Sequence, residues 1–191
     1  MGLVLVVCTG NICRSPLGEG FVRRALQARL AGSAPEVRSA GTAGLEGSVA
    51  TRGSVEAGAE RGLDVSGHEA RRLREPMIDE AVLIVTMTAA HRDEVTAMSP
   101  SAGPRTFTLK ELTRLAEALP APDGAPDLPA RISQADSLRR SGFRGNPYDE
   151  DIADPLGMSL DMYRAIAWEI EEQADRMVEA LVGRGTSEGG D

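Results

Sequence analysis

An apolar, mostly β-branched run at the start of the chain restricts the fold more than any other feature of the sequence. Residues 3–7 read LVLVV, a pattern typical of a strand that is buried on both faces of a parallel sheet. The run AVLIVTM at 81–87 predicts a second strand of this kind. Shorter strands are expected at 37–40 and 106–108. Helical patterns are expected at 16–30, 51–61, 88–98, 109–119 and 159–182.

The alternation of strands and helices predicts an α/β fold. We expect three layers, in which a four-stranded parallel sheet lies between two layers of helices. Open sheets of this kind bind ligands at the carboxyl ends of their strands, where the crossover direction changes. The loop that follows residues 3–7 is therefore the expected site even before its own residues are considered.

The length of the chain indicates one domain. A chain of 191 residues suits a single core, and we place the domain at 1–183. Pro, Asp, Arg, Ser and Gly are frequent over 120–150, which predicts an irregular insertion with a helical turn at most at 136–140. The Gly-rich residues 184–191 predict a disordered tail.

Charge and cysteine content restrict the partners and the compartment. The formal net charge is -8, which opposes non-specific binding to nucleic acid. No apolar run approaches the roughly 20 residues of a membrane helix. Cys8 and Cys13 are the only cysteines, too few for a secreted disulfide scaffold. We expect a cytoplasmic protein without a signal peptide, a monomer or weak dimer, with neither nucleic acid nor membrane as partner.

The residues CTGNICRS, between the first strand and the first helix, carry the chemistry. Backbone N–H groups of a tight loop at a helix start bind phosphate oxygens. Gly10 permits the close turn, and Asn11 tolerates a left-handed conformation. Arg14 presents a planar fork to two oxygens and, with the helix dipole, favours the thiolate of Cys8. We predict a phosphate-binding loop in which Cys8 attacks phosphorus, and Ser15, the expected helix N-cap, donates its hydroxyl to the sulfur.

The string VCTGNICRSP at 7–16 is similar to the signature of the low-molecular-weight protein tyrosine phosphatases. The resemblance extends to SAG at 39–41, to HEAR at 68–71 and to the Asp-Pro pair at 154–155. The full string after a first strand, together with a late Asp-Pro, is far more specific than a cysteine and an arginine with five residues between them. The resemblance therefore covers the predicted domain and implies a phosphatase that needs neither cofactor nor metal.

The resemblance also implies the catalytic roles. Cys8 is the nucleophile that forms a phosphocysteine, Arg14 binds the phosphate, and Asp154 protonates the leaving oxygen, which departs poorly without a proton. The acidic residues at 149–151 are the rivals for this last role, and the Asp-Pro context favours Asp154. The residues expected to bind the phosphate are Thr9, Gly10, Asn11, Ile12, Cys13, Arg14 and Ser15.

Supporting roles follow from the same resemblance. The Asn11 side chain is expected to bind Ser39 and His68 and so to hold the loop in a strained shape. Two interpretations of Cys13 stay open. It is either a resolving thiol that forms a reversible disulfide with Cys8 or a packing residue.

Other polar residues are expected on the surface. We interpret as solvated His91, the arginines at 139, 140 and 144, and the acidic residues at 149–151. The two histidines and two cysteines do not make a zinc site.

The choice of substrate depends on Ile12. An aliphatic side chain suits a flat ring, so we expect hydrolysis of phosphotyrosine in a phosphorylated protein or peptide, with release of phosphate. The string DPLGMS at 154–159 resembles the bacterial branch that includes protein arginine phosphatases, in which Thr commonly replaces Ile12. An arginine phosphatase is therefore an alternative. An arsenate reductase of the same fold is another, disfavoured because no cysteine beyond Cys8 and Cys13 is present to relay a disulfide. The presence of Cys8, Arg14 and Asp154 together argues against a third alternative, a non-catalytic phosphate-binding module.

Overall fold

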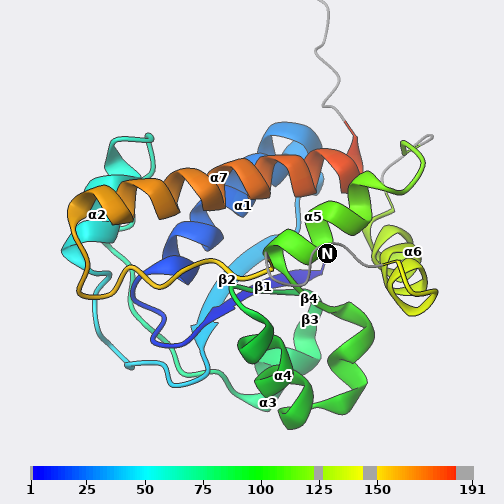
Figure 1. The fold of residues 1–191 in the computed structure, drawn as a ribbon, viewed down its shortest axis with the longest axis horizontal. Coiled ribbons are helices and arrows are strands. Elements are labelled where there is room, and N and C mark those ends of the chain that lie inside the picture. The colour runs from blue at the N-terminus through cyan, green and yellow to red at the C-terminus, as the bar shows by residue number, and fades with distance from the viewer. Residues whose placement is uncertain (1, 123–126, 144–149, 184–191) are drawn as a thin grey trace, which may run out of the picture.

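The computed structural model describes residues 2–122, 127–143 and 150–183 (Figure 1). Within these ranges, four strands form a parallel sheet in the order β2-β1-β3-β4. This confirms the predicted fold class and the four predicted strands. The strands are β1 (Leu3–Cys8), β2 (Glu36–Gly41), β3 (Ala81–Thr86) and β4 (Thr106–Thr108).

Helices cover both faces of the sheet. Over the described ranges, no helix combines the length and the apolar character needed to span a membrane. The helices are α1 (Arg14–Leu30), α2 (Arg52–Ala59), α3 (Glu75–Glu80), α4 (Ala89–Met98), α5 (Leu109–Glu117), α6 (Leu128–Arg140) and α7 (Leu160–Val182), with 3-10 turns η1 (Ala31–Ser33) and η2 (Pro100–Arg105).

The side chains of β1 divide between two apolar clusters. Val4 and Val6 pack in the cluster that includes residues of α1, α5 and α7. Leu5 and Val7 pack in the cluster on the opposite face, with residues of α3 and α4. Figure 1 shows α1 and α7 above the sheet and α3 and α4 below it. The strand is buried on both faces because alternate side chains point to opposite sides, and the three predicted layers are confirmed.

The chain changes crossover direction at β1. The next strand, β2, lies on one side of β1, and the strand after it, β3, lies on the opposite side of β1. The carboxyl end of β1 is therefore the switch point at which ligands bind in such sheets. The predicted phosphate loop begins there.

The first helix begins earlier than its sequence suggests. The sequence predicts Ser15 as the N-cap, but α1 starts at Arg14, and Cys13 holds the N-cap position without a side-chain hydrogen bond that caps the helix. Ser15 is already helical because its hydroxyl is engaged with the loop instead. At the other end, the helix stops at Ala31, which has φ 46°.

The prediction of an irregular segment over 120–150 is wrong for Leu128–Arg140, which form α6. The Asp127 side chain accepts a hydrogen bond from the backbone N–H of Ala130 and caps this helix. Leu128 and Ile132 are buried against the large core cluster, which explains why a polar, Pro-flanked sequence is helical here. Residues 123–126 and 144–149, and the predicted tail at 184–191, lie outside the described residues.

Candidate active site

The loop after β1 is held by its carbonyl groups. The carbonyls of Cys8, Thr9, Gly10 and Ile12 accept hydrogen bonds of 2.8 to 3.1 Å from backbone N–H groups of the segment 42–51. In a planar trans peptide the N–H points opposite to the C=O. The N–H groups that follow these carbonyls therefore point away from the carbonyls' partners, an orientation that suits binding of an anion.

A glycine permits the close approach of this loop to β2. A Cβ atom at Gly41 would lie 2.3 Å from the carbonyl oxygen of Thr9 and 2.9 Å from the nitrogen of Asn11. Asn11 itself has φ 56°, which confirms the predicted left-handed conformation. The loop geometry thus depends on one residue without a side chain and on one that tolerates the left-handed region.

The sulfur of Cys8 has a hydroxyl neighbour. Its Sγ lies 2.9 Å from Ser15 Oγ, as the sequence predicts, and Cys8 is 2% exposed. Asn11 Nδ2 donates to the same Ser15 oxygen at 2.8 Å. Because an amide nitrogen only donates, Ser15 accepts from Asn11 and its own proton remains available to the sulfur.

The Asn11 side chain connects the loop to its surroundings. Its Nδ2 donates to Ser39 Oγ at 2.9 Å, which confirms the predicted contact, and its Oδ1 accepts from the backbone N–H of Arg71 at 2.7 Å. His68 differs from the prediction, because its Nε2 lies 2.7 Å from the backbone oxygen of Asn11 rather than from the side chain. Ser39 in turn donates to Glu19 at 2.6 Å.

Arg14 joins the loop to a segment far along the chain. Its Nη1 donates to the carbonyl of Ile152 at 2.9 Å, and its Nη2 donates to Asp154 Oδ2 at 2.8 Å. The Arg14 side chain is 4% exposed, whereas that of Asp154 is 46% exposed. Among the described residues, the buried Nε of Arg14 has no hydrogen-bond partner. This guanidinium therefore keeps a donor that a bound anion can satisfy.

Cys8, Arg14 and Asp154 meet at one cavity of about 280 Å³. Leu45 and Leu156 form part of its wall, and both are more than half exposed. A thiol, a guanidinium and a carboxylate around one small cavity are the groups that transfer of a phosphoryl group to a thiolate requires. The residues that line the cavity are Cys8, Thr9, Gly10, Ile12, Cys13, Arg14, Ala43, Leu45, Asp154 and Leu156.

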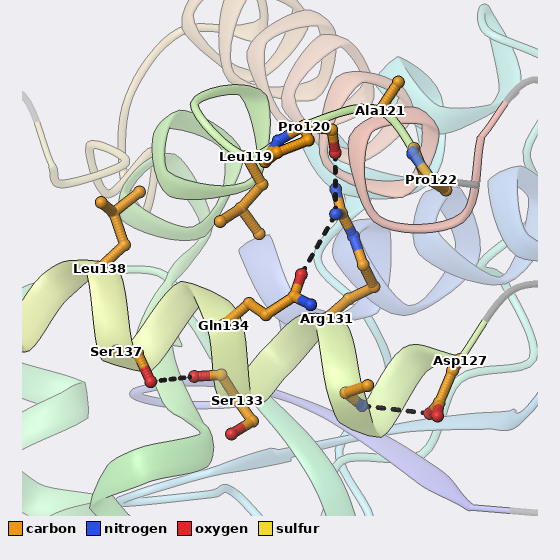
Figure 2. Close-up of a pocket in the computed structure, with 11 residues that line it drawn as sticks. Leu119, Pro120, Ala121, Pro122, Asp127, Arg131, Ser133, Gln134, Ser137 and Leu138 are labelled. Atoms are coloured by element: carbon orange, nitrogen blue, oxygen red, sulfur yellow. Dashed lines mark hydrogen bonds between the residues drawn. The ribbon is translucent and has the colours of Figure 1, made fainter.

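A larger hollow of about 710 Å³ lies beside α6, away from these groups (Figure 2). Its lining includes Arg131, whose Nη1 donates to the carbonyl of Pro120 and whose Nη2 donates to that of Ala180, each at 2.8 Å. Figure 2 shows the guanidinium directed at the Pro120 carbonyl. These bonds tie α6 to the ends of α5 and α7, so Arg131 supports the fold and the chemistry belongs to the smaller cavity.

His91 is the residue that the sequence interpretation missed. It was expected to be solvated, but it is only 4% exposed. Its Nε2 lies 2.8 Å from Thr9 Oγ1 and its Nδ1 lies 2.9 Å from Thr88 Oγ1. Burial and the nearby Arg14 cation lower the pKa of His91. The available signal was its helical spacing from Val95, because the two share the buried face of α4.

Cys13 is buried beside Cys8 in the loop, and both are free thiols. Its Sγ lies 3.5 Å from Thr51 Oγ1 and 3.8 Å from the Tyr163 hydroxyl. Burial raises the pKa of the Cys13 thiol. A protonated thiol is the weaker nucleophile of such a pair.

Residues 3–123 match the family described as low molecular weight phosphotyrosine protein phosphatase. The protein-arginine-phosphatase of Geobacillus stearothermophilus is 32% identical over 93% of this chain and 95% of its own. The low molecular weight protein-tyrosine-phosphatase Etp of Escherichia coli K12 is 41% identical over 54% of this chain and 66% of its own. The chain therefore belongs to the low molecular weight phosphotyrosine protein phosphatase family, which confirms the resemblance seen in the sequence, and it is a phosphatase.

Solved structures agree with this assignment. The tyrosine phosphatase AmsI of Erwinia amylovora superposes with a TM-score of 0.70 at 26% identity, covering 94% of this chain and 93% of its own. The YwlE arginine phosphatase of Geobacillus stearothermophilus superposes with a TM-score of 0.68 at 31% identity, covering 95% of this chain and 93% of its own. The fold is thus shared with phosphatases named for two different substrates.

Proposed function

We propose that this chain hydrolyses phosphotyrosine in proteins or peptides in two steps, through a phosphocysteine on Cys8. The observation that carries the proposal is the convergence of Cys8, Arg14 and Asp154 on one cavity. A solved structure of a serine mutant of the YwlE arginine phosphatase with a phosphorylated active-site serine also supports it, at 26% identity and a TM-score of 0.70.

In the first step, the Cys8 thiolate attacks phosphorus and forms the S–P bond while the P–O bond to the leaving group breaks. Asp154, in its protonated form, gives its proton to the departing oxygen. In the second step, the Asp154 carboxylate takes a proton from a water molecule that attacks the phosphocysteine. The S–P bond breaks, phosphate leaves, and the Ser15 hydroxyl stabilises the returning thiolate.

Arg14 and the loop hold the phosphoryl oxygens throughout. The residues proposed to line the phosphate are Thr9, Gly10, Asn11, Ile12, Cys13, Arg14 and Ser15. In the absence of ligand, Asp154 pairs with Arg14 Nη2. A bound phosphate competes for this guanidinium and so releases Asp154 to act on the leaving group. Asn11, Ser39 and His68 keep the loop in its binding shape.

The cavity wall supports phosphotyrosine as the preferred substrate. Ile12, Ala43, Leu45 and Leu156 place apolar groups beside the loop, where a flat aromatic ring gains from burial. A solved structure of the related Wzb of Vibrio vulnificus holds benzylphosphonate. Hydrolysis of phosphoarginine is the alternative, because close relatives carry that name. Arsenate reduction is disfavoured because the chain has two cysteines in all.

The test compares kcat/KM on phosphotyrosine, phosphoarginine and phosphoserine peptides and on arsenate with a thiol reductant. The proposal predicts the highest value for phosphotyrosine. A higher value for phosphoarginine would transfer the assignment to the alternative, and turnover of arsenate alone would refute both. The mechanism requires a free Cys8 thiol, so we place the enzyme in the reducing cytoplasm.

A further inference from the structure

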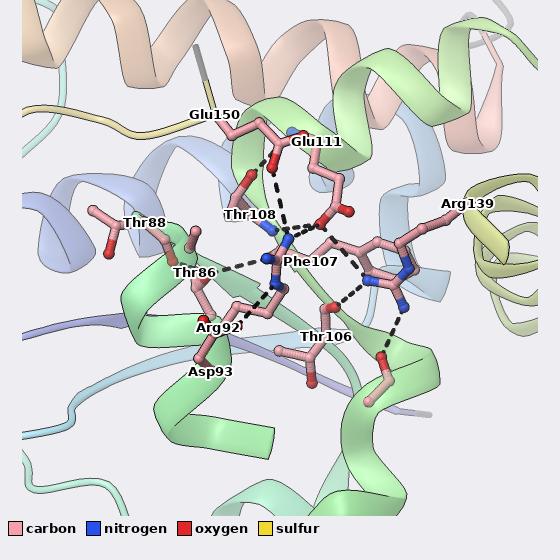
Figure 3. Close-up of polar contacts among 12 residues, drawn as sticks. Thr86, Thr88, Arg92, Asp93, Thr106, Phe107, Thr108, Glu111, Arg139 and Glu150 are labelled. Atoms are coloured by element: carbon pink, nitrogen blue, oxygen red, sulfur yellow. Dashed lines mark hydrogen bonds and ion pairs between the residues drawn. The ribbon is translucent and has the colours of Figure 1, made fainter. Parts of the chain in front are cut away.

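A chain of alternating charges runs from α6 to the segment that carries Asp154 (Figure 3). Two of its members belong to charged stretches that the sequence predicts to be solvated, namely the arginines at 139–140 and the acidic residues at 149–151. In the structure, Arg139 and Glu150 are both mostly buried, with side chains 24% and 16% exposed. Arg144 and Asp149 lie outside the described residues. The successive ion pairs join Asp136, Arg139, Glu111, Arg92, Glu150 and Arg114, in that order.

Glu111 is the centre of this chain. Its side chain is 5% exposed and its Oε2 lies 3.1 Å from Arg92 Nη1 and 3.7 Å from Arg139 Nη1. Arg139 is fixed on its other side, because its guanidinium lies 4.2 Å from the centre of the Phe107 ring and donates to the carbonyl of Thr106 at 2.9 Å. Figure 3 shows Arg92 and Arg139 reaching Glu111 from opposite sides. The geometry links α6 to α4 through α5.

Glu150 is the member of this series of charges that lies nearest to Asp154 in the sequence. Its Oε1 accepts from Arg114 Nη2 at 2.9 Å, and its Oε2 lies 3.6 Å from Arg92 Nη1. A mostly buried carboxylate between two arginines has one favoured position, since displacement would leave charges unpaired. The backbone at residue 150 is therefore held where the chain approaches the cavity.

The backbone between Glu150 and Asp154 is short and fixed. Asp151 Oδ1 accepts from the backbone N–H of Ala89 at 2.7 Å. The N–H of Ile152 donates to the carbonyl of Met87 at 2.8 Å, and its own carbonyl accepts from Arg14. These bonds order the backbone of the four-residue step that joins Glu150 to Asp154.

We propose that Glu150 is a positioning residue for Asp154, held by Arg92 and Arg114, and that α6 supports this position through Arg139 and Glu111. This inference rests on the proposed function, in which Asp154 is the general acid. In this proposal, Glu150 and α6 contribute to catalysis by orienting Asp154 and not by contacting the substrate. Small displacements of a catalytic group lower rates strongly even when they arise far from the chemistry.

The test measures kcat/KM for two aryl phosphates with different leaving groups. The phenol of phenyl phosphate leaves poorly unless its oxygen receives a proton. The 2,4-dinitrophenolate of 2,4-dinitrophenyl phosphate leaves readily without one. We expect Glu150→Gln to lower kcat/KM about tenfold for phenyl phosphate and less than about twofold for 2,4-dinitrophenyl phosphate. A loss of folded enzyme alone would lower both values equally.

Glu171→Gln is the matched control. Glu171 also binds two arginines, Arg24 and Arg61, and its side chain is 17% exposed, but it lies on α7 away from the Asp154 segment. Its ratio of the two rates should stay at the wild-type value. Arg114→Gln, which removes the other side of the Glu150 contact, is a second variant and should change the ratio in the same direction as Glu150→Gln.

Asp154→Asn separates this inference from the proposed function. If Asp154→Asn changes the ratio and neither Glu150→Gln nor Arg114→Gln does, Glu150 does not position the acid, and the inference fails while the proposed function stands. If Asp154→Asn leaves the ratio unchanged, Asp154 is not the acid, and the inference fails with it. A changed ratio in Glu150→Gln that also appears in Glu171→Gln would be a general effect of lost ion pairs and would overturn the inference as well.

Discussion

The hydroxyl oxygen of Ser15 lies 2.9 Å from the sulfur of Cys8, and the amide of Asn11 donates to that same oxygen at 2.8 Å. The amide fixes the direction of the Ser15 proton, because the oxygen must accept from one neighbour and donate to the other. A thiolate at Cys8 therefore receives a hydrogen bond whose geometry is set before any substrate binds. This arrangement is most important when the thiolate is the leaving group.

Ser15→Ala should slow hydrolysis of the phosphocysteine. A hydrogen bond to a charged group contributes about 1.5–3 kcal/mol, so we expect kcat to fall between about tenfold and a hundredfold. Rapid-quench kinetics with an aryl phosphate should retain the initial burst and show a slower steady state. Ser15→Thr, which keeps the hydroxyl, should recover most of the rate, and an equally slow Ser15→Thr would argue against this role.

Asn11→Ala should destabilise the fold. It removes side-chain bonds to Ser15, Ser39 and the backbone of Arg71, and we expect about 2–4 kcal/mol less free energy of unfolding in urea. Asn11→Gly loses the same bonds, but glycine adopts φ 56° without steric cost. We therefore expect Asn11→Gly to be more stable than Asn11→Ala by about 1 kcal/mol. Equal stability of the two variants would show that the left-handed conformation carries no cost here.

His91 should make the fold sensitive to acid. Burial and the Arg14 cation lower its pKa in the folded state, whereas in the unfolded chain the pKa is about 6.5. The unfolded state therefore binds this proton first as the pH falls below about 6.5, and stability is lost over that range down to the folded pKa. Between about pH 7.5 and 5.5 the wild type should lose more free energy of unfolding than His91→Gln. Equal losses of free energy of unfolding in the wild type and in His91→Gln would show that protonation of His91 does not destabilise the fold.

Ile12→Thr should weaken the preference for phosphotyrosine. It removes apolar surface from the cavity wall and introduces a hydroxyl, so we expect kcat/KM for a phosphotyrosine peptide to fall about three- to tenfold. The value for a phosphoserine peptide, which has no ring to contact this side chain, serves as the control and should change little. An unchanged phosphotyrosine value would mean that Ile12 does not contact the ring.

The strands and the phosphate loop were predictable because their signals are local. The apolar run at 3–7 and the loop at 8–15 follow one another directly, and the fold places both as expected. Asp154 was predictable only by resemblance. Its pairing with Arg14 spans 140 residues, and no pattern within the sequence joins them.

The predictions for Ser15, His91 and Glu150 were wrong, each for a physical reason. The sequence predicts Ser15 as a helix cap because capping serines are common, but the Ser15 hydroxyl instead contacts the Cys8 sulfur and accepts from Asn11. The sequence predicts that His91 and Glu150 lie on the surface, because isolated polar side chains usually do. Their burial depends on partners from other elements, Thr9 for His91 and Arg92 and Arg114 for Glu150. Such tertiary pairings leave no periodic signal.

Acid quench followed by mass spectrometry detects whether Cys8 carries the phosphoryl group during turnover. Asp154→Asn, which we expect to slow both steps, is mixed with an aryl phosphate that has a good leaving group and is quenched during turnover. We expect one phosphate on the peptide that contains Cys8 and none in the Cys8→Ala, Asp154→Asn double variant. Phosphate on another residue, or continued turnover in Cys8→Ala, would contradict it.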